Sequence, residues 1–104
     1  MISLLKKLLG SNKAERIADA LQRDAVIIDV RTPGEFSSGH IKGSKNIPLS
    51  QIPAQAEKLK KAGKPVIVCC ASGMRSAQAA GILTNKGVEA INGGGWYSLQ
   101  NKLS

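Results

Sequence analysis

The fold is decided by one stretch of the chain, Pro65-Val66-Ile67-Val68-Cys69-Cys70-Ala71-Ser72-Gly73-Met74-Arg75-Ser76. Residues 65–69 form the most apolar run in the sequence, as expected of a strand buried on both faces. The residues after Cys70 are small, and Gly73 can adopt a positive φ without steric cost, which predicts a curled loop. From Arg75 to Lys86, apolar residues recur at helical spacing. The stretch therefore predicts a strand, a tight loop and a helix, with a cysteine at the turn.

Working outward, the pattern predicts three more strands, over residues 25–30, 46–48 and 88–91. Thr32-Pro33-Gly34 breaks the first of these runs, and a loop is expected to carry Gly39-His40-Ile41. Further helices are predicted from the Asn12 cap, from Ile52 until Gly63 and Pro65 end it, and over residues 96–102. Alternating strands and helices indicate an α/β fold, with a mainly parallel sheet of four to five strands and helices on both faces. Ligands of such sheets bind beyond the carboxyl ends of the strands, where Cys70 lies.

The 104 residues suffice for one domain, which we assign to residues 12–104. The composition is that of a globular protein, with 42% apolar and 21% charged residues. Two adjacent cysteines are poorly placed for a structural disulfide, so reduced thiols and a cytoplasmic location are expected. No apolar run approaches the ~20 residues needed to span a bilayer.

Residues 1–11 are predicted to form an amphipathic helix, with the lysines on one face and the apolar residues Ile2, Leu4, Leu5, Leu8 and Leu9 on the other. We expect it to pack on the domain or on a neighbouring subunit; a membrane-surface role is the lesser alternative. The net charge is +8, but basic residues are scattered and do not alternate with the three aromatic residues. This favours small anions rather than nucleic acid as partners.

A curled loop between a strand and a helix directs successive backbone N–H groups inward, toward an anion. A thiolate at Cys70 would be stabilised there, so its pKa should fall below the ordinary value. Arg75 adds a permanent positive charge suited to an oxyanion. Such a cysteine can attack the outer sulfur of a donor such as thiosulfate, or the phosphorus or arsenic of a tetrahedral oxyanion.

The pattern Cys70-x-x-Gly73-x-Arg75-Ser76 resembles the active-site loop of the rhodanese homology domain. The same family is indicated by Ile28-Asp29-Val30-Arg31 with Glu35-Phe36, by Gly39-His40-Ile41 with Asn46-Ile47-Pro48, and by Gly93-Gly94-Gly95-Trp96. The resemblance covers about residues 25–97 and implies a single rhodanese-like domain. It does not include the family's usual first strand, which is not visible before Asn12.

The resemblance implies a thiosulfate sulfurtransferase in which Cys70 is the catalytic residue and carries the transferred sulfur as a persulfide. The substrate would be bound by the rest of the loop, Ala71, Ser72, Gly73, Met74, Arg75 and Ser76, with Asp29 and Arg31 as supporting residues. The expected partners are a small anionic sulfur donor and an acceptor, either cyanide or a thiol, including a protein thiol. No cofactor and no metal are implied, and a lone histidine makes no metal site.

Two alternatives stay open. Counted from Cys69, the spacing to Arg75 is that of cysteine phosphatases and some arsenate reductases. Gly73 follows Cys70 by three residues, where both patterns place a glycine, and this favours the sulfurtransferase. A non-catalytic binding module of the same fold is the second alternative, although it would not need this loop.

The remaining marked residues are given structural roles. We expect Cys69 to pack within its strand, with a resolving thiol as the minority hypothesis. Asp29 is predicted to fasten loop amides and Arg31 to pair locally with Glu35, while His40 fixes a turn.

Overall fold

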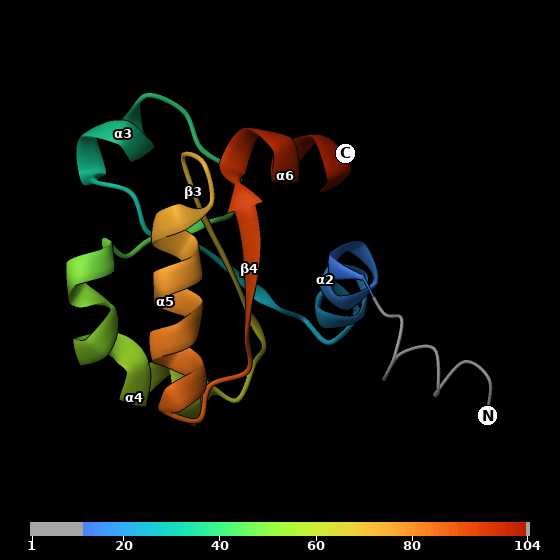
Figure 1. Cartoon of the computed structure of the whole chain (residues 1–104), viewed down its shortest axis with the longest axis vertical. Helices are drawn as coiled ribbons and strands as arrows, with labels where there is room; N and C mark the ends of the chain where they lie inside the picture. Colours follow the sequence, from blue (N-terminus) through green and yellow to red (C-terminus); the bar gives the residue numbers. More distant parts are fainter. Residues whose placement is uncertain (1–11, 104) are drawn as a thin grey trace.

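The structure, a computed structural model, describes residues 12–103. The helix predicted for residues 1–11 lies outside the described residues. Four strands form one sheet, β1 (Val26–Asp29), β2 (Lys45–Asn46), β3 (Val66–Cys70) and β4 (Ala90–Gly95). Their order is β2-β1-β3-β4 and every pairing is parallel, which confirms the predicted sheet (Figure 1).

Helices cover both faces of the sheet, as predicted (Figure 1). One face carries α4 (Ile52–Ala62) and α5 (Met74–Asn85). The other carries α2 (Lys13–Gln22) and α6 (Trp96–Leu103). Among the described residues, no helix is long and apolar enough to cross a bilayer.

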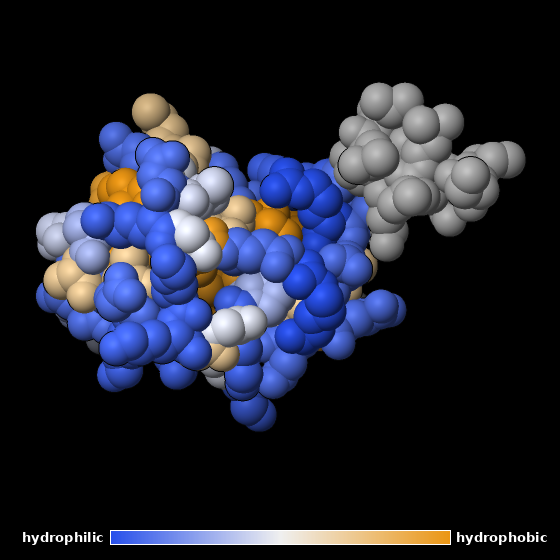
Figure 2. Space-filling model, turned by 90° about the horizontal axis from the view of Figure 1, so that it is seen from below, coloured by the Kyte–Doolittle hydropathy of each residue, from blue (hydrophilic) through white to orange (hydrophobic). Residues whose placement is uncertain are grey.

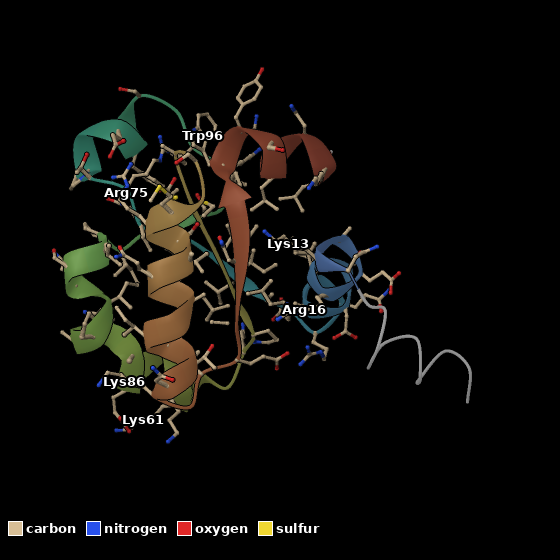
Figure 3. The ribbon with its side chains drawn as sticks, in the orientation of Figure 1. Lys13, Arg16, Lys61, Arg75, Lys86 and Trp96 are labelled. Atoms are coloured by element: carbon tan, nitrogen blue, oxygen red, sulfur yellow. The ribbon has the colours of Figure 1, made fainter. Side chains whose placement is uncertain are left out.

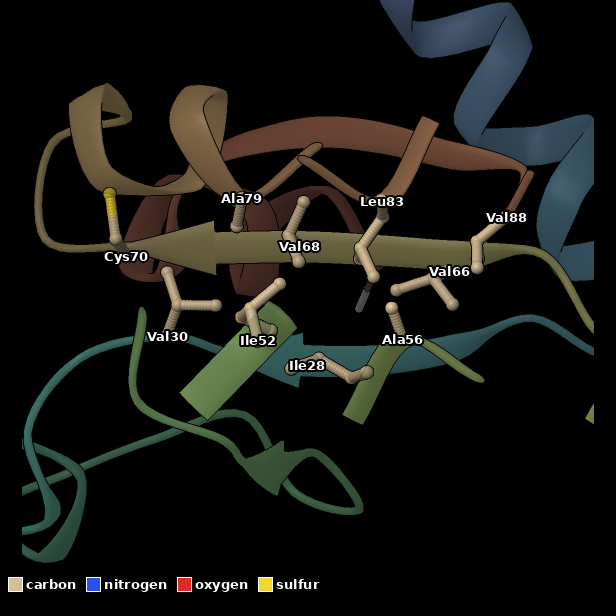
Figure 4. Packing of buried hydrophobic residues seen from close by; sticks show 10 residues of the cluster. All are labelled: Ile28, Val30, Ile52, Ala56, Val66, Val68, Cys70, Ala79, Leu83 and Val88. Atoms are coloured by element: carbon tan, nitrogen blue, oxygen red, sulfur yellow. The ribbon is translucent and has the colours of Figure 1, made fainter. Parts of the chain in front are cut away.

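The central strand β3 is buried along its whole length and contributes to both cores. Val66, Val68 and Cys70 pack against α4 and α5 in one cluster (Figure 4). Ile67 and Cys69 belong to the cluster under α2 and α6. Because side chains alternate along a strand, the two adjacent cysteines face opposite sides of the sheet, which confirms the expected packing of Cys69.

The chain between β1 and β2 contains a short helix, α3 (Pro33–Ser37), where a loop was predicted. Thr32 and Glu35 form a reciprocal capping box, and Pro33 begins the helix with a suitable φ. A second short helical segment, the 3-10 helix η1 (Leu49–Gln51), leads into α4. The capping signal was present in the sequence, but the run is too short to show helical periodicity.

The glycine run lies within β4, and the prediction that the strand ends at residue 91 is wrong. The register between β3 and β4 shifts after Val68, which pairs with Asn92 whereas the next residue pairs with Gly94. A Cβ atom at Gly93 would lie 2.9 Å from a methyl group of Ile67. The absence of a side chain at Gly93 therefore lets β4 stay paired with β3 as far as Cys70, which lies opposite Gly95.

The positive charge is spread over the molecule (Figure 3). Lys61 and Lys86 lie at the end of the molecule opposite Arg75, and Lys13 and Arg16 lie on α2. Seen from the end that carries the two lysines, the surface is mostly hydrophilic (Figure 2). Within the described residues, the basic side chains are therefore not confined to the surroundings of the cysteine loop.

Candidate active site

Cys70 ends β3 at the carboxyl edge of the sheet, and the loop to α5 curls over its side chain (Figure 4). Its Sγ atom accepts a hydrogen bond from the backbone N–H of Gly73 at 2.9 Å and from that of Ser76 at 3.4 Å. The Ser76 hydroxyl lies 3.3 Å away and can donate to the sulfur or accept from it. Cys70 and Ser76 are both buried. The loop thus forms a cradle of donors around one sulfur atom.

This cradle changes the acidity of the thiol. Burial alone raises the pKa of Cys70, because it disfavours the charged form. The Ser76 hydroxyl and the backbone amides of Ser76, Gly73 and Ser72 outweigh burial, and the net pKa lies below the ordinary value. The direction is the one predicted from the loop sequence, and it favours a nucleophilic thiolate.

Asn92, on β4, forms hydrogen bonds with two residues of the cradle, Gly73 and Ser76. Its Oδ1 atom accepts from the Ser76 hydroxyl at 2.6 Å and from the Gly94 N–H at 3.0 Å, while Nδ2 donates to the Gly73 carbonyl at 3.2 Å. These contacts fix the orientation of the amide and connect the end of β4 to the start of α5. Asn92 is not among the site residues predicted from the sequence; its place directly before the glycine run is the signal that could have indicated it.

Glycines make this close approach geometrically feasible. Gly73, the N-cap of α5, has a φ of 107°, a conformation that residues with a side chain rarely adopt. Gly94 has a φ of 85°. At Gly95, a Cβ atom would lie 2.9 Å from the Ala71 carbonyl oxygen. The loop and β4 therefore pack backbone against backbone.

Arg75 is engaged by Glu35 of α3. Nη1 donates to Oε1 at 2.8 Å and Nη2 donates to Oε2 at 2.9 Å. This hydrogen bonding, followed by that from the Thr32 backbone, lowers the pKa of Glu35 to about 2. Arg75 is also close enough to Cys70 for a thiolate there to raise the pKa of the guanidinium, although the Glu35 hydrogen bond is the larger cause. The guanidinium predicted to meet a substrate oxyanion is thus already paired.

The family model for the rhodanese-like domain matches residues 12–102. The chain belongs to the rhodanese-like domain family. It is 44% identical over 69 residues to the uncharacterized protein YqhL of Bacillus subtilis, a match that takes in 66% of this chain and 54% of that protein. It is 36% identical over 70 residues to the thiosulfate sulfurtransferase GlpE of Pseudoalteromonas translucida, over 67% of this chain and 66% of the relative.

Among solved structures, a rhodanese-like domain protein from Staphylococcus aureus superposes with a TM-score of 0.66 at 31% identity. The superposition covers 93% of this chain and 83% of that one. Against the curated relatives, however, this rhodanese-like chain spans about half of YqhL and two thirds of GlpE. What those whole proteins do is therefore a matter for proposal.

In this rhodanese-like domain, Asp29 and Arg31 form a buried pair beside the loop that leads to α3. Asp29 accepts from the Arg31 backbone N–H at 3.0 Å and from Nη2 at 2.7 Å. Arg31 also donates to the Gly39 carbonyl at 2.6 Å, and its guanidinium lies 4.9 Å from the Trp96 ring centroid. The prediction that Arg31 pairs with Glu35 is wrong, because the nearer carboxylate of Asp29 is buried with it.

The other predicted residues of the rhodanese-like loop are exposed, whereas the neighbouring Cys69 is buried. Ala71, Ser72 and Met74 are exposed, with Met74 78% accessible. A shallow depression beside the loop and the start of α5 is lined by Ser72, Met74, Arg75, Ala77 and Gln78. Cys69 lies on the opposite face; burial and then the Asp29 charge raise its pKa to about 12.

His40 has a structural position. Its ring stacks on Phe36 with centroids 3.7 Å apart, and Nδ1 hydrogen-bonds the Phe36 carbonyl at 2.7 Å. This is the predicted role of fixing a turn. Within residues 12–103, no group of three or more His, Cys, Asp or Glu side chains could hold a metal ion.

Proposed function

We propose that the protein is a sulfurtransferase that moves a sulfane sulfur from a donor such as thiosulfate to a thiophilic acceptor through a persulfide on Cys70. The observation that carries the proposal is the 2.9 Å hydrogen bond from the Gly73 N–H to the Cys70 sulfur, within a cradle that lowers the thiol pKa. Membership of the rhodanese-like family and the similarity to the thiosulfate sulfurtransferase GlpE support sulfur transfer as the reaction.

The chemistry is two successive displacements at sulfur. The Cys70 thiolate attacks the outer sulfur of thiosulfate; a new S–S bond forms, the old S–S bond breaks, and sulfite leaves with the electron pair. An acceptor, cyanide in vitro or a thiol, then attacks the outer sulfur of the persulfide. The Cys70 thiolate is released and the acceptor retains the sulfur.

The loop residues supply binding and orientation in this proposal. The backbone amides of Ser72, Gly73 and Ser76 stabilise the thiolate and the persulfide that replaces it. Arg75, which lies within electrostatic reach of Cys70, would bind the leaving sulfite once Glu35 has released it. The reaction needs a reduced thiol, which a cytoplasmic location would provide.

The buried position of Cys69 weighs against the phosphatase and arsenate reductase alternatives. Its side chain faces the cluster under α2 and α6, and its pKa of about 12 disfavours a thiolate. The same facts weigh against Cys69 as a resolving thiol. A binding module without catalysis would have no use for the lowered pKa of Cys70.

The test is an intact-mass spectrum of the reduced protein after incubation with thiosulfate, followed by peptide mapping. We expect one added sulfur atom on Cys70, which cyanide removes as thiocyanate. Cys70→Ala should gain no sulfur, whereas the matched variant Cys69→Ala should gain it normally. Absence of sulfur on a wild-type protein whose Cys70 still alkylates would contradict the proposal for this donor.

A further inference from the structure

Glu35 is held in place from two sides. Besides its two bonds with Arg75, its Oε1 atom accepts from the Thr32 backbone N–H at 3.0 Å and from the Thr32 hydroxyl at 3.1 Å. The Thr32 contacts belong to the capping box of α3, so the carboxylate is fixed independently of Arg75. Its side chain is 38% exposed and that of Arg75 is 34% exposed. The ion pair therefore lies at the surface, and the cap of α3 holds the Glu35 carboxylate against the Arg75 guanidinium.

Arg31 does not offer a free guanidinium in place of Arg75. Arg31 uses its nitrogens on Asp29 and on the Gly39 carbonyl. The cations of α2, Lys13 and Arg16, lie well away from Arg75 in Figure 3. An anion that approaches Cys70 thus meets backbone amides and the Arg75 guanidinium, which is paired with Glu35.

We propose that Glu35 is a specificity-determining residue: by occupying Arg75, it weakens the use of sulfur donors with an oxyanion end and favours alkyl persulfides whose alkyl group carries no charge. The inference rests on the proposed sulfurtransferase function. A sulfonate must take the guanidinium nitrogens from a carboxylate that the α3 cap holds nearby. A donor without an oxyanion has no such competitor.

The favoured step balances without a further reactant. The Cys70 thiolate attacks the outer sulfur of R–S–SH, and a new S–S bond forms to that sulfur. The inner S–S bond breaks, and the electron pair leaves with the alkyl thiolate R–S⁻. The group R would lie in the shallow depression beside the loop. Apart from Arg75, the residues that line it are uncharged: Ser72, Met74, Ala77 and Gln78.

The experiment compares two donors, thiosulfate and freshly generated 2-hydroxyethyl persulfide, by the second-order rate of sulfur loading on Cys70. In Glu35→Gln, the amide oxygen can still accept from Thr32, while the negative charge is lost. We expect the thiosulfate rate to rise about threefold to fivefold, as for release of a partly exposed ion pair. The persulfide rate should change less than twofold.

Two further variants separate local from general effects. Glu89→Gln removes the same charge from an exposed pair with Arg23 and should leave both rates unchanged. Glu35→Gln combined with Arg75→Ala should lose the thiosulfate gain, since the freed guanidinium is then absent. A gain that survives in the double variant, or that appears equally in Glu89→Gln, would overturn the inference.

Failure of the inference is distinct from failure of the proposed function. If wild type loads sulfur but Glu35→Gln changes both donors in parallel, Glu35 is structural and the inference is wrong. If wild type loads sulfur from neither donor, the sulfurtransferase proposal itself fails. Thermal unfolding is measured for each variant; should Glu35→Gln not fold, Glu35→Asp takes its place, and a smaller rise for thiosulfate alone is expected.

Discussion

Ser76→Ala tests whether a side chain or the backbone stabilises the Cys70 thiolate. The Ser76 hydroxyl lies 3.3 Å from the sulfur, and its hydrogen bond is the largest of the contributions that lower the pKa of Cys70 against the effect of burial. The same hydroxyl lies 2.6 Å from Asn92 Oδ1 and 3.2 Å from the Gly73 carbonyl oxygen. One proton serves three acceptors, so the thiolate gains it only by competition.

The magnitude follows from the value of a hydrogen bond to a charged group, about 1.5–3 kcal/mol. At 3.3 Å and with two competing acceptors, the lower end applies, which is a rise of about one pKa unit in Ser76→Ala. At a pH below the Cys70 pKa values of both proteins, the thiolate fraction of Ser76→Ala is about tenfold smaller than that of wild type. A more basic thiolate is a better nucleophile, with a Brønsted slope of about 0.4–0.5, so alkylation slows about threefold there and quickens about threefold at high pH.

The assay is the rate of Cys70 alkylation by iodoacetamide across a pH series, with the thiolate absorbance followed in parallel. Ser72→Ala is the matched control, because Ser72 is exposed and contributes to the thiolate through its backbone, which the substitution keeps. We expect the Ser76→Ala profile to cross that of wild type, and the control to follow wild type. A Ser76→Ala profile that coincides with wild type would show that the Ser76 hydroxyl donates its hydrogen bond to Asn92 throughout and that backbone amides alone stabilise the thiolate.

Three further predictions concern the frame around the loop. Gly95→Ala places a Cβ atom 2.9 Å from a backbone carbonyl oxygen, so we expect about 1–3 kcal/mol of destabilisation in denaturant unfolding and slower Cys70 alkylation, whereas Gly81→Ala, which meets nothing within 4 Å, should be neutral or stabilising. Asp29→Ala leaves the buried Arg31 guanidinium without its carboxylate and should cost about 3–5 kcal/mol by the same measurement. The unfolded chain releases the Cys69 proton near pH ~8.5, whereas the folded chain releases it near the raised pKa of about 12. The free energy of unfolding should therefore fall by up to about 1.4 kcal/mol per pH unit above pH ~9. In Cys69→Ala it should fall less steeply with pH. Equal slopes for the variant and wild type would contradict the raised pKa of Cys69.

The elements whose signals are local could be predicted from the sequence. The apolar run of β3 and the helical spacing of α5 place Cys70 at a strand end beneath a helix start, and the structure has both elements there. Alternation along β3 also separates the two cysteines between opposite faces. These features depend on periodicity within a few residues, which a single sequence displays.

The contacts that complete the site join residues far apart in the chain, and periodicity carries no information about them. Glu35 reaches Arg75 across 40 positions, and Asn92 reaches Ser76 across 16. Glu35 was assigned to the wrong arginine because Arg31 is nearer in sequence, whereas the capping box turns the carboxylate toward the loop. A partner chosen by sequence proximity fails wherever a helix start sets the direction of the side chain.

The electrostatics of the loop follow from this arrangement. Arg31 and Arg75 each meet a carboxylate, on Asp29 and Glu35, so each pair carries no net charge. The lowered pKa of Cys70 has its causes in the Ser76 hydroxyl and in backbone amides, which are dipoles fixed by the fold. Fixed dipoles stabilise charge on the sulfur without attracting anions from a distance, unlike free cations. The loop is therefore built to favour a charged sulfur at Cys70 more than a charged substrate beside it, and salt should change the rate of loading from thiosulfate more in Glu35→Gln than in wild type.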